Sequence, residues 1–288
     1  MQDIEKVINL LKNNKVIAMV APSFVIDFNY KTFADKLRTI GFDKVTELTF
    51  GAREVNLFYR DYLKKHPKDL WISTTCPAVV DIVLKKFPHL IDNLIPGVSP
   101  MVAMSKIIHK EYPKHKIVFI GPCMYKKKEA DKFSDVDVAL TYKEIPALFK
   151  LCKANNLCKK VDKKSYYFDQ FYDDATKVYP ISGGLAKSMH IKEVLKPEEV
   201  IVCDGSCAIK MLEKFNEHPG KVKFLDILFC KGGCVGGPGV ITKMPTLFRK
   251  KKVWNYMKFA KKHKTGEKVG LDKYLKGIDF KIKKFKIL

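Results

Sequence analysis

Three apolar runs of this sequence each lead into a cysteine, and no other feature constrains the fold as strongly. The runs cover residues 71–75, 116–120 and 225–229, and the cysteines that follow them are Cys76, Cys123 and Cys230. Short apolar runs bounded by glycine or proline are typical of buried strands. In open α/β sheets, functional groups gather beyond the carboxyl ends of the strands. The sequence therefore predicts a fold in which thiols from separate strands reach one crevice.

Strand and helix patterns alternate along the rest of the chain. We expect strands at 15–20, 44–48, 70–74, 116–120, 200–203 and 222–229, helices at 3–13, 31–40, 54–64, 78–87, 101–112 and 206–216, and a strand–helix unit at 136–155. This order predicts an α/β fold with mostly parallel or mixed sheets flanked by helices. We expect two α/β lobes, 1–105 and 106–240, with a cofactor in the crevice between them. A basic helical tail at 241–288 is expected to wrap the lobes.

A fourth cysteine, Cys234, lies in a glycine-rich turn four residues after Cys230. Four thiolates are what a 4Fe-4S cluster needs. Structural zinc is the first alternative, but its ligands usually come as two local pairs, and only Cys230 and Cys234 form one here. Ordinary core packing is the second alternative, since free cysteine is often buried. Flanking glycines, which let a backbone approach a bulky cluster, favour the iron-sulfur interpretation.

The segments around these cysteines resemble the catalytic domain of the FeFe hydrogenases over nearly the whole chain. The three cysteine motifs are Thr74-Thr75-Cys76-Pro77, the stretch from Gly121 to Ala130 with Pro122-Cys123-Met124, and Cys230-Lys231-Gly232-Gly233-Cys234-Val235-Gly236-Gly237. Linking stretches match as well, namely Ala21-Pro22-Ser23, 41–45, Phe50-Gly51-Ala52, Ser99-Pro100, 137–141 and Ser182-Gly183-Gly184. Each motif is weak alone, but their order and separations make the resemblance specific.

The resemblance implies a six-iron cofactor, the H-cluster, and the reversible conversion of dihydrogen to two protons and two electrons. Its cubane, a 4Fe-4S cluster, would be held by the four cysteines and joined through Cys234 to a two-iron unit with carbon monoxide, cyanide and a bridging azadithiolate. Lys126 matches the lysine that donates a hydrogen bond to one cyanide. The further residues that match cofactor-binding motifs are Pro22, Ser23, Ser99, Gly183 and Gly184. Such hydrogen bonds would orient the two-iron unit, which has few covalent ties to protein.

Departures from the family pattern concern proton transfer. Thr75 stands where active members carry a cysteine that shuttles protons, and a threonine hydroxyl is a much weaker acid than a thiol. Our hypothesis is that Thr75 and ordered water replace that cysteine. Other family positions also differ: Tyr59, Tyr62 and Ile95 stand on the usual proton path, Gly121 and Leu228 replace pocket methionines, and Met101 replaces a pocket glutamine.

Two alternatives to a hydrogenase therefore stay open. The first is a protein that senses hydrogen with little turnover, which the loss of the usual proton path favours. The second is an iron-sulfur assembly or scaffold protein that holds only a 4Fe-4S cluster. The glycine-rich segment Val235-Gly236-Gly237-Pro238-Gly239 favours a hydrogenase over a scaffold protein.

The formal net charge of +23 bears on the partners. Nucleic acid is the first hypothesis for so basic a chain. We do not expect it, because the excess is lysine rather than arginine, which reads bases bidentately, and no known DNA-binding motif is present. An acidic electron carrier such as ferredoxin is a better match, because opposite charge speeds encounter. The resemblance also implies contacts with hydrogenase maturation proteins.

The sequence also bears on the cellular location of the protein and on the role of its remaining cysteines. No apolar run approaches the roughly 18 residues of a membrane span, and the first residues lack the pattern of a secretory signal. We therefore expect a cytoplasmic protein with no membrane partner, and the resemblance implies a role in anaerobic hydrogen metabolism. The other cysteines, Cys152, Cys158, Cys203 and Cys207, are expected to pack rather than bind a second cluster. No cysteine precedes Cys76, so we expect electrons to enter and leave the cubane directly or through a partner.

Overall fold

The computed structural model describes residues 1–132, 135–160, 167–169, 173–215, 220–263 and 272–285. Its first sheet has four strands in the order β2-β1-β4-β5, all parallel. Their bounds are Val16–Val20 for β1, Lys44–Glu47 for β2, Lys116–Gly121 for β4 and Val138–Thr141 for β5. Every residue of β1 is buried, as expected for a central strand whose two faces are both covered by helices.

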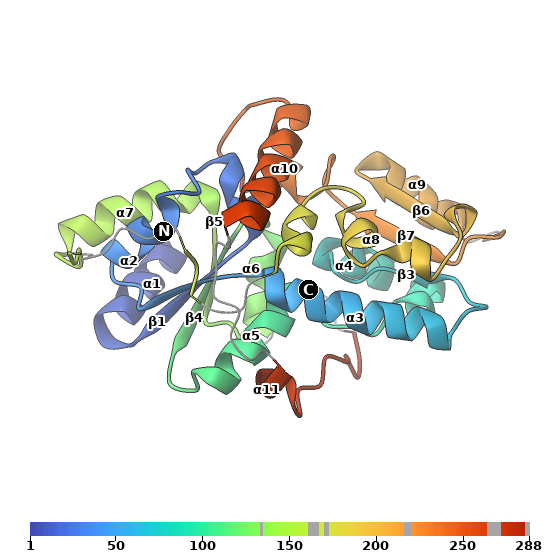
Figure 1. Cartoon of the computed structure of the whole chain (residues 1–288), viewed down its shortest axis with the longest axis horizontal. Helices are drawn as coiled ribbons and strands as arrows, with labels where there is room; N and C mark the ends of the chain where they lie inside the picture. Colours follow the sequence, from blue (N-terminus) through green and yellow to red (C-terminus); the bar gives the residue numbers. More distant parts are fainter. Residues whose placement is uncertain (133–134, 161–166, 170–172, 216–219, 264–271, 286–288) are drawn as a thin grey trace.

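A second sheet has the order β3-β7-β6 and is also parallel. Its strands are Trp71–Ile72 (β3), Val200–Asp204 (β6) and Phe224–Leu228 (β7). Figure 1 shows the two sheets at opposite ends of the molecule, with helices around both. The predicted α/β fold with parallel sheets and flanking helices is thus confirmed.

The expected boundary near residue 105 does not divide the sheets. The first sheet joins β1 and β2 to β4 and β5, and the second joins β3 to β6 and β7. Parallel neighbours need long crossover connections, so the chain leaves one sheet, builds part of the other and returns. Each sheet therefore takes strands from both sides of residue 105.

Helices α3 (Thr49–Lys65) and α5 (Pro100–Glu111) form a layer that both sheets share. Their Phe50 and Met104 pack with Met19 of the first sheet, whereas Val55 and Tyr59 pack with the second sheet. A Cβ at Gly51 would lie only 2.6 Å from the Met104 Cβ, so glycine allows the two helices to approach closely. This layer joins the cores of the two halves.

The remaining helices cover the outer faces and the ends of strands. They are α1 (Gln2–Asn13), α2 (Phe33–Thr39), α4 (Pro77–Lys86), α6 (Tyr125–Lys132), α7 (Ile145–Ala154), α8 (Gly184–Ser188) and α9 (Ser206–Lys214). Most lie within a few residues of the sequence expectation. Three differ: α3 begins at Thr49 rather than at residue 54, and α6 and α8 are not among the expected helices. The lysine-rich sequence of α6 has little apolar pattern, and α8 is only five residues long.

The C-terminal segment contains α10 (Thr246–His263) and α11 (Asp272–Leu275), while residues 264–271 and 286–288 of the expected tail lie outside the described residues. Helix α10 packs on three short 3₁₀ helices: η1 (Pro22–Ile26), η4 (Ala175–Val178) and η7 (Cys234–Gly236). Its Arg249 donates hydrogen bonds to the carbonyls of Val235 and Thr242, at 3.0 and 2.9 Å. No helix among the described residues is long and apolar enough to cross a membrane.

Candidate metal centre

Four free cysteines stand at the ends of elements from both sheets. Cys76 follows β3 and is the N-cap of α4, Cys123 follows β4, Cys230 follows β7, and Cys234 begins η7. Because β3 and β7 are parallel neighbours, Cys76 and Cys230 leave the second sheet at the same edge. The other sheet supplies Cys123 from its central pair of strands.

Glycines bring the Cys234 loop against the Cys123 loop. A Cβ at Gly237 would lie 2.6 Å from the Pro122 carbonyl oxygen, and one at Gly239 would lie 2.8 Å from the same atom. The Gly239 amide donates a hydrogen bond to that oxygen at 2.9 Å. Only glycine, which has no side chain, allows this approach. The close contact therefore explains why glycines stand at these two positions of the motif.

The pKa values of the cysteines indicate how close the four thiols are. Burial raises the pKa of Cys123 to about 11, with Cys76 adding to the shift, and that of Cys230 to about 12, with Cys76 and Cys123 adding. Burial also raises the pKa of Cys234 well above its usual value, and the three other thiols add to it. Every pair of the four therefore interacts electrostatically.

This donor set suits a polynuclear iron cluster. Thiolates are the ligands of such clusters, and a bound cation offsets the cost of ionising buried thiols. No group of three or more His, Cys, Asp or Glu side chains in the part of the chain that is described is arranged to hold a single metal ion.

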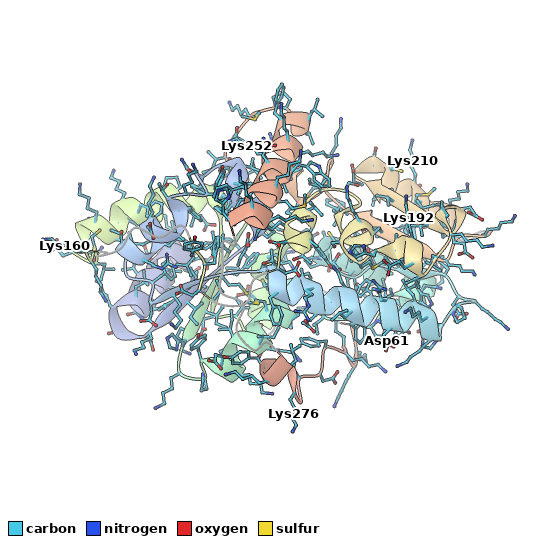
Figure 2. The ribbon with its side chains drawn as sticks, in the orientation of Figure 1. Asp61, Lys160, Lys192, Lys210, Lys252 and Lys276 are labelled. Atoms are coloured by element: carbon cyan, nitrogen blue, oxygen red, sulfur yellow. The ribbon has the colours of Figure 1, made fainter. Side chains whose placement is uncertain are left out.

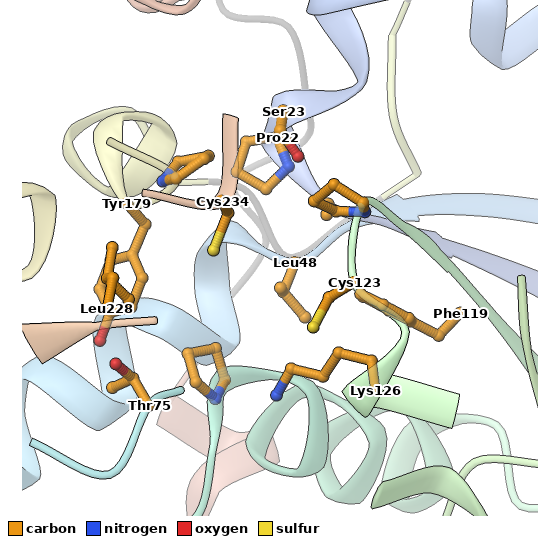
Figure 3. Close-up of a pocket in the computed structure, with 14 residues that line it drawn as sticks. Pro22, Ser23, Leu48, Thr75, Phe119, Cys123, Lys126, Tyr179, Leu228 and Cys234 are labelled. Carbon is orange, nitrogen blue, oxygen red and sulfur yellow. The ribbon is translucent and has the colours of Figure 1, made fainter. Parts of the chain in front are cut away.

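A pocket opens beside Cys123 and Cys234, and protein atoms leave about 530 Å³ free in it, part of it open to solvent. Figure 3 shows both sulfurs turned toward the pocket, with the amine of Lys126 pointing in from one wall. Four residues that the sequence analysis selected line it: Pro22, Ser23, Thr75 and Lys126. Further lining residues are Ala21, Leu48, Pro100, Phe119, Pro122, Tyr179, Pro180 and Leu228.

Lys126 is held in place by two side chains. Its ammonium donates hydrogen bonds to Ser99 Oγ at 2.8 Å and to Glu129 Oε2 at 2.5 Å, and its side chain is 10% exposed. Ser99 is also the N-cap of α5, so it links this helix to the lysine, although it does not line the pocket. Sequence reasoning missed Glu129, which its i,i+3 spacing on a lysine-containing helix can reveal.

The wall formed by Pro22 and Ser23 is braced by Tyr142. The Ser23 and Tyr142 hydroxyls lie 2.6 Å apart, and Tyr142 donates a hydrogen bond to the Ala21 carbonyl at 3.1 Å. Burial raises the pKa of Tyr142 well above its usual value, so this hydroxyl stays protonated. The arrangement fixes the loop that begins at the end of β1.

Thr75 lines the pocket, but the residues behind it form a closed set of hydrogen bonds. The Thr74 hydroxyl donates to the carbonyls of Ile95 and Gly97, at 2.9 and 3.1 Å. Tyr59 is fully buried, lies 2.8 Å from that hydroxyl and accepts a hydrogen bond from the Thr74 amide at 2.7 Å. These bonds end on the backbone carbonyls of Ile95 and Gly97, and none of them involves the Thr75 side chain.

Gly183 and Gly184 do not line the pocket. Gly183 has a φ of +77° and is the N-cap of α8, and a Cβ at Gly184 would lie 2.1 Å from the Val178 carbonyl oxygen. They allow a tight turn after Pro180, whose carbonyl accepts a hydrogen bond from the Val235 amide at 3.2 Å. The two glycines thus position a loop that supports the Cys234 turn.

The two positions that replace the family's pocket methionines, Gly121 and Leu228, lie beside the pocket or in its wall. A Cβ at Gly121 would lie 2.5 Å from the Phe119 ring, which occupies that space and lines the pocket. Leu228 lines it as well. Sequence reasoning did not select Phe119, Leu48 or Tyr179, because their place in the pocket depends on the tertiary structure.

The four other cysteines are not neighbours in sequence of the four that lie near the pocket. Cys152 and Cys203 are buried, and burial raises their pKa values to about 11 and about 12, whereas Cys158 and Cys207 are exposed. Cys152 belongs to the apolar core around the first sheet and Cys203 to the core around the second.

A family model and two related sequences that match this chain are all described as hydrogenases. The family model described as "Iron only hydrogenase large subunit, C-terminal domain" matches residues 14–238. Iron hydrogenase 1 of Clostridium pasteurianum is 23% identical over 302 residues, which cover 83% of this chain and 52% of that protein. The NADP-reducing hydrogenase subunit HndD of Solidesulfovibrio fructosivorans is 25% identical over 268 residues, which cover 72% of this chain and 44% of that subunit. The chain spans about half the length of these relatives.

Solved structures share the fold. A variant of the FeFe-hydrogenase HydA1 from Chlamydomonas reinhardtii has a TM-score of 0.68 and 18% identity, and the match covers 95% of this chain and 93% of that one. The structure described as HydA(deltaEFG), from a study of stepwise H-cluster assembly, has a TM-score of 0.64 and 19% identity, with 88% of each chain covered.

Proposed function

Because this chain belongs to the family of the iron-only hydrogenase large subunit, C-terminal domain, we propose that it is an FeFe hydrogenase that interconverts dihydrogen with two protons and two electrons. One observation carries the proposal. Four free cysteines from both sheets interact electrostatically beside a pocket that also receives Lys126, Ser23 and Thr75. This is the donor set that an H-cluster requires.

In this proposal Cys76, Cys123, Cys230 and Cys234 hold the 4Fe-4S cluster. The pocket beside Cys234 takes the two-iron unit with its carbon monoxide, cyanide and azadithiolate ligands. When bound, this cofactor would supply the site at which dihydrogen is split heterolytically, and it would take up the two electrons in that direction or deliver them in the reverse one. The protein supplies the ligands, the orientation and the surrounding electrostatics.

Lys126 is proposed to donate a hydrogen bond to one cyanide. Its bonds to Ser99 and Glu129 fix the position of its ammonium group at the pocket wall. Pro22 and Ser23 are proposed to receive the other cyanide on the wall that Tyr142 braces. Gly183 and Gly184 act through the loop that supports the Cys234 turn.

Thr75 is proposed to move protons, with ordered water, between the pocket and solvent. It is the residue of the first cysteine motif whose side chain lines the pocket, and it is 8% exposed. A threonine hydroxyl passes a proton by accepting one and donating another, without being an acid itself.

The same region favours one other function, a hydrogen sensor with little turnover. The hydrogen bonds of Tyr59 and Thr74 end on the carbonyls of Ile95 and Gly97, so among the described residues this set of bonds leads to no acidic side chain. A slow proton supply would permit hydrogen binding while limiting catalysis.

We infer an acidic electron carrier such as ferredoxin as the redox partner, hydrogenase maturation proteins as assembly partners, and a cytoplasmic location. The inference about the carrier rests on the net charge of +23, which favours encounter with an anionic protein. Figure 2 shows lysines at widely separated places on the molecule, with Lys160, Lys210 and Lys276 at different edges of the view.

Hydrogen uptake and evolution by anaerobically purified protein, with its cubane built and a two-iron unit supplied, tests the proposal. The control is the same protein with the cubane alone. Turnover only in the fully loaded sample supports the hydrogenase. A loaded sample without turnover supports the sensor, and failure to load the two-iron unit supports the cubane-only scaffold protein.

A further inference from the structure

Tyr179 has a buried hydroxyl that no hydrogen bond satisfies among the described residues, and the same side chain lines the pocket. It follows η4, where its backbone amide donates a hydrogen bond to the Thr176 carbonyl at 3.0 Å. In the view of Figure 3 its ring extends along one wall of the pocket, with the hydroxyl toward Thr75 and Leu228. The backbone of this residue is therefore fixed while its polar atom has no partner.

A buried hydroxyl without an acceptor is unusual. Such a group loses its hydrogen bonds to water, so folded proteins pair nearly all of them. Burial raises the pKa of Tyr179 well above its usual value, and Tyr59, Asp226 and Cys234 add to the shift. The phenol thus keeps its proton and can act only as a neutral donor or acceptor.

Three polar groups interact electrostatically with the Tyr179 hydroxyl, and two of them have hydrogen bonds of their own. The Tyr59 hydroxyl bonds to the Thr74 hydroxyl and accepts a second hydrogen bond from the Thr74 amide. Asp226 Oδ2 accepts a hydrogen bond from the Ala186 amide at 3.0 Å. The third group is Cys234, the proposed bridging ligand at the pocket that Tyr179 lines.

We propose that Tyr179 donates its hydroxyl hydrogen to an anionic acceptor of the group bound at Cys234. This inference rests on the proposed function. The acceptor is the Cys234 sulfur once it ligates iron, or a ligand of the two-iron unit in the pocket beyond it. In both cases the donor makes the cofactor site more electropositive on the wall that Tyr179 shares with Thr75, because hydrogen bonds to ligands tune a metal centre.

The test compares Tyr179→Phe with wild type and with the control Tyr274→Phe. Tyr274 is buried too, but its hydroxyl donates a hydrogen bond to Glu111 Oε1 at 3.1 Å, on α5 and away from the pocket lining. Three readouts are used: the cubane reduction potential without a two-iron unit, the carbonyl and cyanide infrared bands after loading, and the rate at which the two-iron unit is lost.

An acceptor at the Cys234 sulfur predicts a more negative cubane potential in Tyr179→Phe even without the two-iron unit. An acceptor on the two-iron unit predicts an unchanged cubane potential, a shift of one carbonyl or cyanide band and loss of the unit about tenfold faster, equivalent to about 1.4 kcal/mol. Tyr274→Phe leaves all three readouts as in wild type.

If potential, bands and loss rate in Tyr179→Phe all equal those of wild type, the hydroxyl has no such role and the inference is wrong. If wild type itself never shows carbonyl and cyanide bands, the proposed function fails instead. The cubane potential then still decides whether Tyr179 donates to the Cys234 sulfur.

Discussion

Lys126, Lys127 and Lys128 form a run in the sequence, yet each has a different environment. Lys126 is buried and bonded to Ser99 and Glu129, whereas Lys127 pairs with Asp3 and Glu144, at 2.8 and 2.7 Å. Lys128 lies 5.0 Å from the Tyr125 ring centroid. Composition alone suggests three solvated charges. The position of Lys126 three residues after Cys123 is the feature that marks it for function.

Thr75 is the residue whose chemistry limits the proposed reaction most. Thr75→Val keeps the β-branched shape and removes the hydroxyl, so we expect hydrogen turnover to fall by about 100-fold, the usual scale of a lost proton-transfer group. Thr75→Cys introduces a thiol with a pKa near 8.5 and is expected to turn over at least as fast as wild type. Both rates are measured on samples with matched iron and infrared bands.

Unchanged turnover in Thr75→Val would exclude the hydroxyl as a proton carrier. Unequal loading of the two variants would instead indicate that residue 75 shapes the pocket. The infrared spectra separate these outcomes, because a pocket change alters the bands before any turnover occurs.

Asp226 gives a prediction about pH and stability. Burial raises its pKa from 3.8 to about 6, because a single hydrogen bond from the Ala186 amide compensates little of the lost hydration. Between pH 4 and 6 the folded state holds a proton that the unfolded state has released, so this group's contribution to stability falls as pH rises. Above pH 6 the contribution stays at its lowest value, a loss of about 3 kcal/mol.

Asp226→Asn removes this titration and keeps an oxygen for the Ala186 amide. The difference in free energy of unfolding between Asn variant and wild type is expected to grow in favour of the variant from pH 4 to pH 7. Urea unfolding at several pH values measures it. A difference that does not change with pH would mean that Asp226 keeps an ordinary pKa in the fold.

At the scale of elements, glycine-containing loops hold the two halves of the site together. The Cys234 turn rests on the Cys123 loop through the Pro122 carbonyl and on the 180–184 loop through the Pro180 carbonyl. Helix α10 then covers the Cys234 turn with Arg249, and its Tyr256 packs near the buried ion pair of Lys177 and Glu47. These contacts fix the ligands without any further covalent link.

Gly184→Ala tests this arrangement. The new Cβ would lie 2.1 Å from the Val178 carbonyl oxygen, so the backbone must shift and carry Pro180 away from the Cys234 turn. We expect a loss of about 1–3 kcal/mol in stability and poor loading of the two-iron unit. Gly277→Ala is the control, because its left-handed φ of +78° is strained but no atom lies within 4 Å of the new Cβ.

The control should lose about 1 kcal/mol and keep normal loading. Equal loading of both variants would show that the 180–184 loop is not required for the pocket. Iron content and infrared bands, with urea unfolding of the same preparations, distinguish the two results.

For the whole molecule, the local sequence pattern indicates where the cysteines stand on the strands, but it does not indicate which strands pair. Cysteines at the ends of strands converge because parallel strands of one sheet end at the same edge, so Cys76 and Cys230 follow from local pattern. The interleaving of the sheets across residue 105 depends on which strands pair, and no local feature specifies that. Helix α6 lacks an apolar stripe, so only its Lys126–Glu129 pair indicates it.

The pocket was predictable only in part, for the same reason. Ser23, Thr75 and Lys126 belong to motifs and were selected, whereas Tyr179, Leu48 and Phe119 enter the pocket through packing between distant segments. Tyr179 lies after a 3₁₀ turn near residues 170–172, which are outside the described part of the chain. Its unpaired hydroxyl becomes visible only when the neighbours from α3, β7 and the Cys234 turn are in place.

One measurement tests the central claim most directly: iron content and infrared spectra of anaerobic protein before and after a two-iron unit is supplied. We expect the protein to hold about four irons per chain before loading and about six after it. Carbonyl and cyanide bands should appear only on loading. The matched control, Cys234→Ser, should bind no two-iron unit. Four irons without bands in wild type, or equal bands in wild type and Cys234→Ser, would contradict the account.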